Sequence, residues 1–208
     1  MPAALEAARK LFAHAGAPAE FQLGDIAAAG TPDHDLVFNA GVLEHYTLAE
    51  QAELLRGMAS RSRRYVLVLV PNRLCYWYWL WRIYHTARGG WPYGKEVPLV
   101  DMRAMFARAD LHFVGEAFLG IDWTEEFITN LPGLDDELRA HILEVHRHTI
   151  IPRPQRAYLL AALGTVAPDV PVPAGLFGPP PVNEEFELSQ LHTIIADLVA
   201  QRVQADHA

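Results

Sequence analysis

The segment "YVLVLVPN" (Tyr65 to Asn72) constrains the fold of this chain more than any other. It is apolar without alternation, so both of its faces should be covered, as in the middle of a parallel sheet with helices on each side. Apolar residues recur at helical spacing before and after it, in Leu48 to Met58 and in Leu99 to Ala109. Strands that alternate with helices predict an open α/β sheet.

The remaining periodic segments extend this pattern. Further strands are predicted at Glu20–Ile26, Asp35–Asn39, His112–Gly120 and Arg156–Gly164, and further helices at Ala3–Ala15, Leu74–Thr86 and Asp135–His148. The last two strands lack the usual short crossover helix, which predicts an antiparallel strand late in a mostly parallel sheet. We assign residues 1–166 to this sheet domain.

Composition changes after the sheet domain. Residues 167–183 contain "PDVPVP" and "FGPPPV" and predict an extended, proline-rich linker. Residues 184–208 predict a helical tail, with an apolar stripe of Leu188, Leu191, Ile195 and Leu198. Because an isolated helix of this length is marginal in water, we expect it to dock on its own domain or on a second chain.

Bulk composition excludes several classes of partner. Lys and Arg number 17 and Asp and Glu 25, so the formal charge is 17 − 25 = −8, which argues against a nucleic-acid partner. The single cysteine, Cys75, rules out an internal disulfide and indicates a reducing, cytoplasmic location. No stretch approaches the ~20 apolar residues of a membrane span.

The segment "HDLVFNAGVLEHY" (His34 to Tyr46) is the most specific in the chain. It joins an apolar strand to a small-residue turn and the pair Glu44-His45. With "PAALEAARK", "FQLGDI", "YVLVLVPN" and "PLVDMRAMFARADL", it resembles the class I S-adenosylmethionine-dependent methyltransferases, from Pro2 to about Val166. The resemblance implies an incomplete doubly wound, Rossmann-like sheet, whose family order of strands is 3-2-1-4-5-7-6.

The chain lacks what that family carries earlier in sequence. The first strand with its glycine-rich loop, the first crossover helix, and the second strand with its acidic end have no counterpart among the 208 residues. Glycine in that loop lets the backbone approach the cofactor closely. The sequence therefore predicts a truncated domain or a natural remnant, weak or absent binding of S-adenosylmethionine, and an unpaired apolar edge at Asp35 to Asn39.

The resemblance also implies roles for individual residues. Gly24, Asp25 and Ile26 would face the adenine of the cofactor, and Asn39, Ala40 and Gly41 would lie near its methionine part. A turn aspartate and an ordinary strand-to-helix turn are the alternative interpretations. His45 is a candidate base, although the Glu-His pair is common across family members with unrelated substrates and so favours a role in framing the pocket.

Aromatic residues are concentrated in the insertion "CYWYWLWRIYHTARGGWPYG" (Cys75 to Gly94). By resemblance this insertion forms a lid over the substrate, contributed by Trp77, Trp79, Trp81, Tyr84, Trp91 and Tyr93. A helix buried against the sheet is the second interpretation, and peripheral contact with a membrane the third. The helix face with His141, Glu144 and His148 is interpreted as solvated surface, and we predict no metal site.

These observations predict an S-adenosylmethionine-dependent methyltransferase domain that acts on a small-molecule or lipid-linked acceptor. Methyl transfer from a sulfonium needs alignment and exclusion of water more than it needs a catalytic triad. The competing hypothesis is a non-catalytic interaction module that kept the sheet and lost the donor site. A nicotinamide-dependent oxidoreductase is less well supported, because its glycine fingerprint is also missing.

Overall fold

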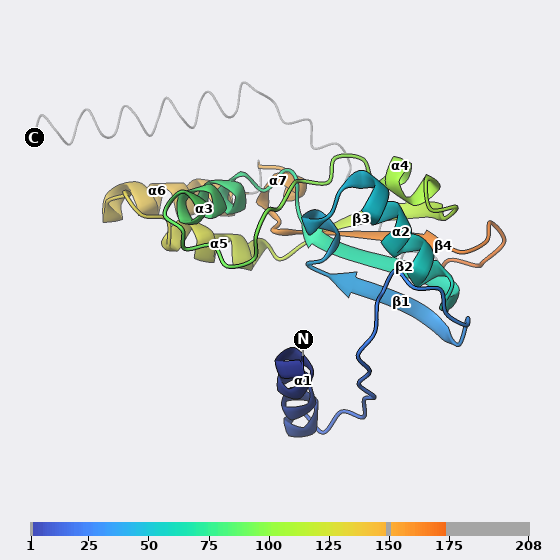
Figure 1. Cartoon of the computed structure of the whole chain (residues 1–208). Helices are drawn as coiled ribbons and strands as arrows, with labels where there is room; N and C mark the ends of the chain where they lie inside the picture. Colours follow the sequence, from blue (N-terminus) through green and yellow to red (C-terminus); the bar gives the residue numbers. More distant parts are fainter. Residues whose placement is uncertain (1, 149–150, 174–208) are drawn as a thin grey trace, which may run out of the picture.

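A four-stranded mixed sheet forms the centre of the molecule (Figure 1). The structure is a computed structural model that describes residues 2–148 and 151–173. The strands are His34–Ala40 (β1), Ser62–Pro71 (β2), His112–Leu119 (β3) and Leu159–Thr165 (β4), in the order β1-β2-β4-β3. β1 and β2 are parallel, and β4 is antiparallel to both of its neighbours. The prediction of an α/β sheet with an antiparallel late strand is confirmed.

Helices lie on one face of the sheet and at one of its ends. They are Pro2–His14 (α1), Leu48–Ala59 (α2), Tyr76–Ala87 (α3), Met102–Ala107 (α4), Ile121–Thr129 (α5), Asp136–Arg147 (α6) and Arg153–Arg156 (α7), with a 3-10 turn at Leu43–His45 (η1). The sequence did not predict α5 or α7. Figure 1 shows α3, α5 and α6 as a lobe beyond the carboxyl ends of β1 and β2, whereas α1 stands apart from the sheet. Within the described ranges, no helix is long and apolar enough to cross a bilayer.

The core lies between the sheet and the pair α2 and α4. Val66, Val68 and Val70 of β2 are fully buried there. The alternate residues Leu67 and Leu69 point to the other face and are only half-buried. The expectation that both faces of this strand are covered is therefore wrong for the described residues, because α2 and α4 pack on the same face and α3, which follows β2, lies in the lobe beyond the sheet.

The predicted strand at Glu20–Ile26 is also wrong. This segment forms no sheet ladder, and its end packs against the last turn of α2. Gly57 permits that contact, since a Cβ there would lie 2.2 Å from the carbonyl oxygen of Ile26. Alternation of apolar residues does not make a strand without a partner to pair with. Within the described part of the chain β1 is consequently an edge strand, as predicted, and its Phe38 is 62% exposed.

The segment after the sheet is described only in part. Residues 167–173 form neither helix nor strand. The rest of the linker, 174–183, and the predicted helical tail, 184–208, lie outside the described residues.

Candidate functional site at the carboxyl ends of the strands

The turn after β1 opens onto the end of the sheet where ligands of open α/β folds bind. The backbone N–H of Gly41 donates to the carbonyl of Leu69 at 2.9 Å, which extends the pairing of β1 with β2 by one residue. Gly41 then takes a positive φ of 66°, a conformation that favours glycine. Only the Glu44 carboxylate comes near the space beside it, with Oε1 3.6 Å from the position of a Cβ on Gly41. The turn can therefore admit a ligand close to the backbone.

Asn39 does not point into this opening. Its side chain is buried under α2, and its Nδ2 lies 3.0 Å from the sulfur of Met58. Its Oδ1 is buried without a hydrogen-bond partner. Of the three residues predicted for the methionine part of the cofactor, Ala40 and Gly41 are exposed at the turn and Asn39 supports it from below.

The turn η1 places the side chains of Glu44 and His45 beside the opening. Gln51 of α2 donates from Nε2 to the carbonyls of Leu43 and Tyr46, at 3.0 and 2.9 Å. The backbone N–H of Val97 donates to the carbonyl of Glu44 at 3.0 Å. Glu44 is only 3% exposed, and its Oε2 has no hydrogen-bond partner among residues 2–148 and 151–173.

Glu96 connects this turn to the helical lobe. Its carboxylate accepts from the Tyr78 hydroxyl and, at 3.1 Å, from Nε of Arg82, both on α3. On its other side, Nε2 of His45 lies 3.9 Å from Oε1 of Glu96. No sequence motif marks Glu96, Tyr78 and Arg82; only the i, i+4 spacing of the last two on one helix could have indicated a shared partner.

Burial raises the pKa values of three groups in and beside this cluster. Loss of solvent raises the pKa of the Glu44 carboxyl above its ordinary value of 4.5, and the nearby Glu96 charge adds to this effect. Burial likewise raises the pKa of Tyr158 to about 12, with Glu96 and Glu44 contributing. The pKa of Tyr78 is raised by burial and by its hydrogen bond to Glu96. Both shifts favour the protonated phenol, and the Tyr78 hydroxyl donates to Glu96.

The aromatic insertion forms the interior of the lobe and its border with this cluster. Trp81 packs against Trp91 and Phe127 with ring centroids 5.5 and 5.2 Å apart. Nε1 of Trp79 donates to the carbonyl of Asn72 at 3.0 Å, which ties α3 to the end of β2. Trp77 and Tyr84 are half-buried and Tyr93 is exposed. The predicted lid residues thus lie at the carboxyl-end edge, and several of them pack on one another.

Gly24, Asp25 and Ile26 lie at the opposite end of the sheet. Arg61, just after α2, donates to the carbonyls of Asp25 and Ile26 at 3.2 Å each. The Asp25 carboxylate accepts from the backbone N–H of Ala27 at 2.9 Å, as a turn aspartate does. Since β1 starts beside Arg61 and runs away from it, the length of that strand separates Asp25 from the turn at Gly41. The structure does not bring the two predicted halves of the cofactor site together.

A groove borders the cluster on the side of α2 and α4. Its volume is about 550 Å³, and it is lined by His45, Leu48, Val97, Leu99, Met105 and Arg108, among others. Apolar atoms form most of the lining surface, and Glu44, Lys95, Asp101 and Arg108 add charged groups to it. His45 faces it, and its Nδ1 lies 3.1 Å from the carbonyl of Lys95.

The histidine face of α6 shows no sign of metal binding in the described residues. Nδ1 of His141 lies 2.8 Å from the carbonyl of Glu137, one turn earlier. Between residues 2 and 173, leaving out 149 and 150, no three His, Cys, Asp or Glu side chains gather closely enough to hold a metal ion.

Comparisons with known proteins find similar solved structures only. No protein-family model matches the chain, and no curated protein matches it. The magnesium protoporphyrin IX methyltransferase of Synechocystis PCC 6803, with bound SAH, is 13% identical, with 71% of this chain and 50% of that chain covered and a TM-score of 0.41. A SAM-dependent methyltransferase of Archaeoglobus fulgidus is 18% identical, with 65% and 61% covered and a TM-score of 0.39.

A third similar structure is the Haloferax volcanii complex of the Trm112 methyltransferase activator with a methyltransferase. It is 17% identical, with 74% of this chain and 66% of that chain covered and a TM-score of 0.48. The chain spans about half the length of the Synechocystis protein. Similarity at this level transfers neither a ligand nor an activity.

The raised pKa of Glu44 predicts a gain of stability from the substitution Glu44→Gln. A carboxyl whose pKa is higher in the folded than in the unfolded state contributes its full stability below the unfolded pKa, here 4.5, and loses it as pH rises through the folded pKa. The variant should therefore match the parent near pH 4 and exceed it at pH 7 to 8, by urea denaturation. Glu50→Gln is the control.

The pKa of Glu50, the control residue, shifts in the opposite direction to that of Glu44. The exposed Glu50 carboxylate has a lowered pKa because it accepts hydrogen bonds from Thr47 in the capping box of α2. Its contribution is present above pH 4.5 and lost as pH falls, so Glu50→Gln should bring no gain at pH 7. A loss of stability at pH 7 in Glu44→Gln would show that the ionised carboxylate has a partner after all.

Proposed function

We propose that this chain is an S-adenosylmethionine-dependent methyltransferase domain that acts on a small-molecule or lipid-linked acceptor. The observation that carries the proposal is the strand order β1-β2-β4-β3 with β4 antiparallel. This is the order that the family resemblance predicts for its strands 4-5-7-6. The segments that resemble strands four to seven correspond to β1, β2, β3 and β4 in chain order.

The turn at Gly41 fits the methionine side of the cofactor. Its backbone is open, and the buried Oε2 of Glu44 beside it lacks a partner. When bound, S-adenosylmethionine supplies a methyl group activated by a sulfonium cation. The contribution of the chain is to hold the backbone of Ala40 and Gly41 against the donor, to place negative charge near a cation through Glu44, and to exclude water with the aromatic lobe.

The groove beside His45 fits the acceptor. At about 550 Å³ it has the volume of a small-molecule site, and its apolar lining suits an apolar or lipid-linked molecule. Glu44 and His45 line the groove, and Glu44 also reaches the turn at Gly41. In this arrangement the His45 side chain forms part of the wall of the acceptor site.

A second candidate function is a non-catalytic interaction module. The observation that favours it is the position of Asp25, which is held at the far end of the sheet by Arg61. A methyltransferase sheet without adenine contacts would keep its fold and lose the binding site for the methyl donor.

Calorimetric titration of S-adenosylmethionine into the full chain tests the proposal. The missing glycine loop and ribose acid remove several hydrogen bonds worth about 0.5–1.5 kcal/mol each, which corresponds to about 100-fold in affinity. We expect saturable but weak binding, with a dissociation constant above about 100 μM. Absence of saturation at millimolar concentration would favour the interaction module, and low-micromolar affinity would contradict the expected loss of contacts.

A further inference from the structure

The face of the sheet opposite α2 and α4 is apolar and open along β1 and β2. The parallel register places Leu36 beside Tyr65, Phe38 beside Leu67 and Ala40 beside Leu69, all on this face. Leu36 is 46% and Phe38 62% exposed, and Leu67 and Leu69 are half-buried. We call the surface formed by Leu36, Phe38, Leu67 and Leu69 the open face. Contiguous apolar surface of this kind marks a docking site.

The described part of the chain ends at the rim of the open face. After β4 the backbone N–H of Val166 donates to the carbonyl of Arg64 at 3.1 Å. Farther on, the Tyr65 hydroxyl donates to the carbonyl of Pro171. Tyr65 shares its face of β2 with Leu67 and Leu69, so the described chain reaches the open face at Pro171.

We propose that the open face is the docking site of the chain's own segment 184–204. The apolar stripe of Leu188, Leu191, Ile195 and Leu198 covers eleven residues, which is ten helical steps or about 15 Å. Along the open face, β2 runs five residues from Tyr65 to Leu69, which is four steps or about 13 Å. The chain from Pro173 to Glu184 makes eleven steps and reaches up to about 36 Å when extended, which is long enough to return over the open face.

Charge complements this fit. The segment begins with Glu184, Glu185 and Glu187. Arg63, which is exposed, lies at the start of β2, next to Arg64, whose carbonyl accepts from the backbone N–H of Val166 after β4. A helix that starts there places its acidic first turn near Arg63 and its apolar stripe over Phe38 and Leu67.

Two other occupants are less well placed. The apolar stripe of α1 already has a contact, with Phe12 and Phe21 centroids 5.5 Å apart, and Arg61 anchors the chain after it at Asp25 to Ala28. A second copy could pair along the edge of β1. This inference is independent of the proposed function, because it concerns the face of the sheet and not its carboxyl ends.

Disulfide trapping in the full chain tests the proposal. The native Cys75 is buried and can remain. In Phe38→Cys with Leu191→Cys, oxidation should give a cross-linked monomer of increased mobility on a non-reducing gel in most molecules. The matched control, Phe38→Cys with Thr193→Cys, places the second thiol on the opposite side of the predicted helix and should cross-link at least several-fold less.

Each other outcome overturns the proposal. Equal cross-linking of both pairs would show random proximity, and no cross-linking would show that the segment lies elsewhere. Covalent dimers from Phe38→Cys alone would identify a second copy as the occupant. Preferential cross-linking of Phe38→Cys with Leu5→Cys would identify α1. As a second readout, a chain ending at Pro173 should bind an apolar dye several-fold more strongly, and unchanged binding would count against docking.

Discussion

Replacing Phe106 by alanine should lower the free energy of unfolding by about 3–5 kcal/mol. The ring belongs to α4, is fully buried and lies in the core between α2, α4 and the sheet. Its centroid is 6.0 Å from that of Phe113 on β3, in an edge-to-face contact. The substitution removes both this contact and the largest fully buried side chain of the core, and the rigid sheet cannot close the cavity. Urea denaturation measures the change.

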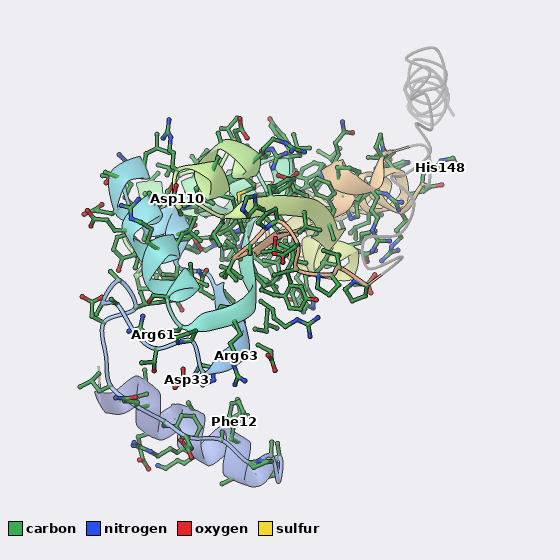
Figure 2. The ribbon with its side chains drawn as sticks, turned by 90° about the vertical axis from the view of Figure 1, so that its right-hand side faces the viewer. Phe12, Asp33, Arg61, Arg63, Asp110 and His148 are labelled. Carbon is green, nitrogen blue, oxygen red and sulfur yellow. The ribbon has the colours of Figure 1, made fainter. Side chains whose placement is uncertain are left out.

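Phe12→Ala is the matched control, since the same deletion is made on α1, which stands apart from the sheet (Figure 2). Phe12 is 40% exposed and its recorded ring contact is with Phe21. We expect Phe12→Ala to lower the free energy of unfolding by no more than about 1 kcal/mol. Equal costs for the two substitutions would mean that α4 does not pack on the sheet as described.

Replacing Arg61 by alanine should lower the free energy of unfolding by about 2–3 kcal/mol, the range for hydrogen bonds to a charged group. Its guanidinium donates to the carbonyls of Asp25 and Ile26 at 3.2 Å each and to that of Gly57 at 2.8 Å. It also donates to the carbonyl of Ala28. Those carbonyls bind the segment before β1 to α2. Hydrogen exchange at Ala28 and Gly30 should accelerate in the variant, together with the loss of stability.

Arg63→Ala serves as the comparison, because Arg63 lies two residues away and donates only to the carbonyl of Asp33 in the described structure (Figure 2). Its cost should be below about 1 kcal/mol. If Arg61→Ala is as mild as Arg63→Ala, residues 25–30 are not held at the amino ends of the strands, and Asp25 becomes available to the cofactor.

Much of the sheet was predictable because its strands are apolar runs bounded by clear turns. Tyr65–Asn72 and His112–Gly120 were predicted within a few residues of β2 and β3. The antiparallel β4 followed from the missing crossover and from the resemblance. The strand at Glu20–Ile26 failed because pairing requires a neighbour, which periodicity along one segment does not reveal.

The site was predictable only in its backbone. The turn at Ala40 and Gly41 followed from the small residues at the end of an apolar strand. The cluster of Glu96, Tyr78, Arg82 and Glu44 was not predicted, because Glu96 lies in a loop without periodicity and meets α3 only through the tertiary fold. The separation of Asp25 from Gly41 was likewise hidden, since it depends on the long-range contacts of Arg61.

Backbone amide chemical shifts during titration with S-adenosylmethionine test the central claim most directly. A donor held at the turn after β1 should shift the amides of Ala40, Gly41 and Glu44 progressively up to millimolar ligand. The amides of Ala27 and Ala28, at the other end of the sheet, should stay unchanged because Arg61 holds that segment away. Shifts confined to residues 25–28, or no shift at Gly41 at saturating ligand, would contradict a methyl-donor site at this turn.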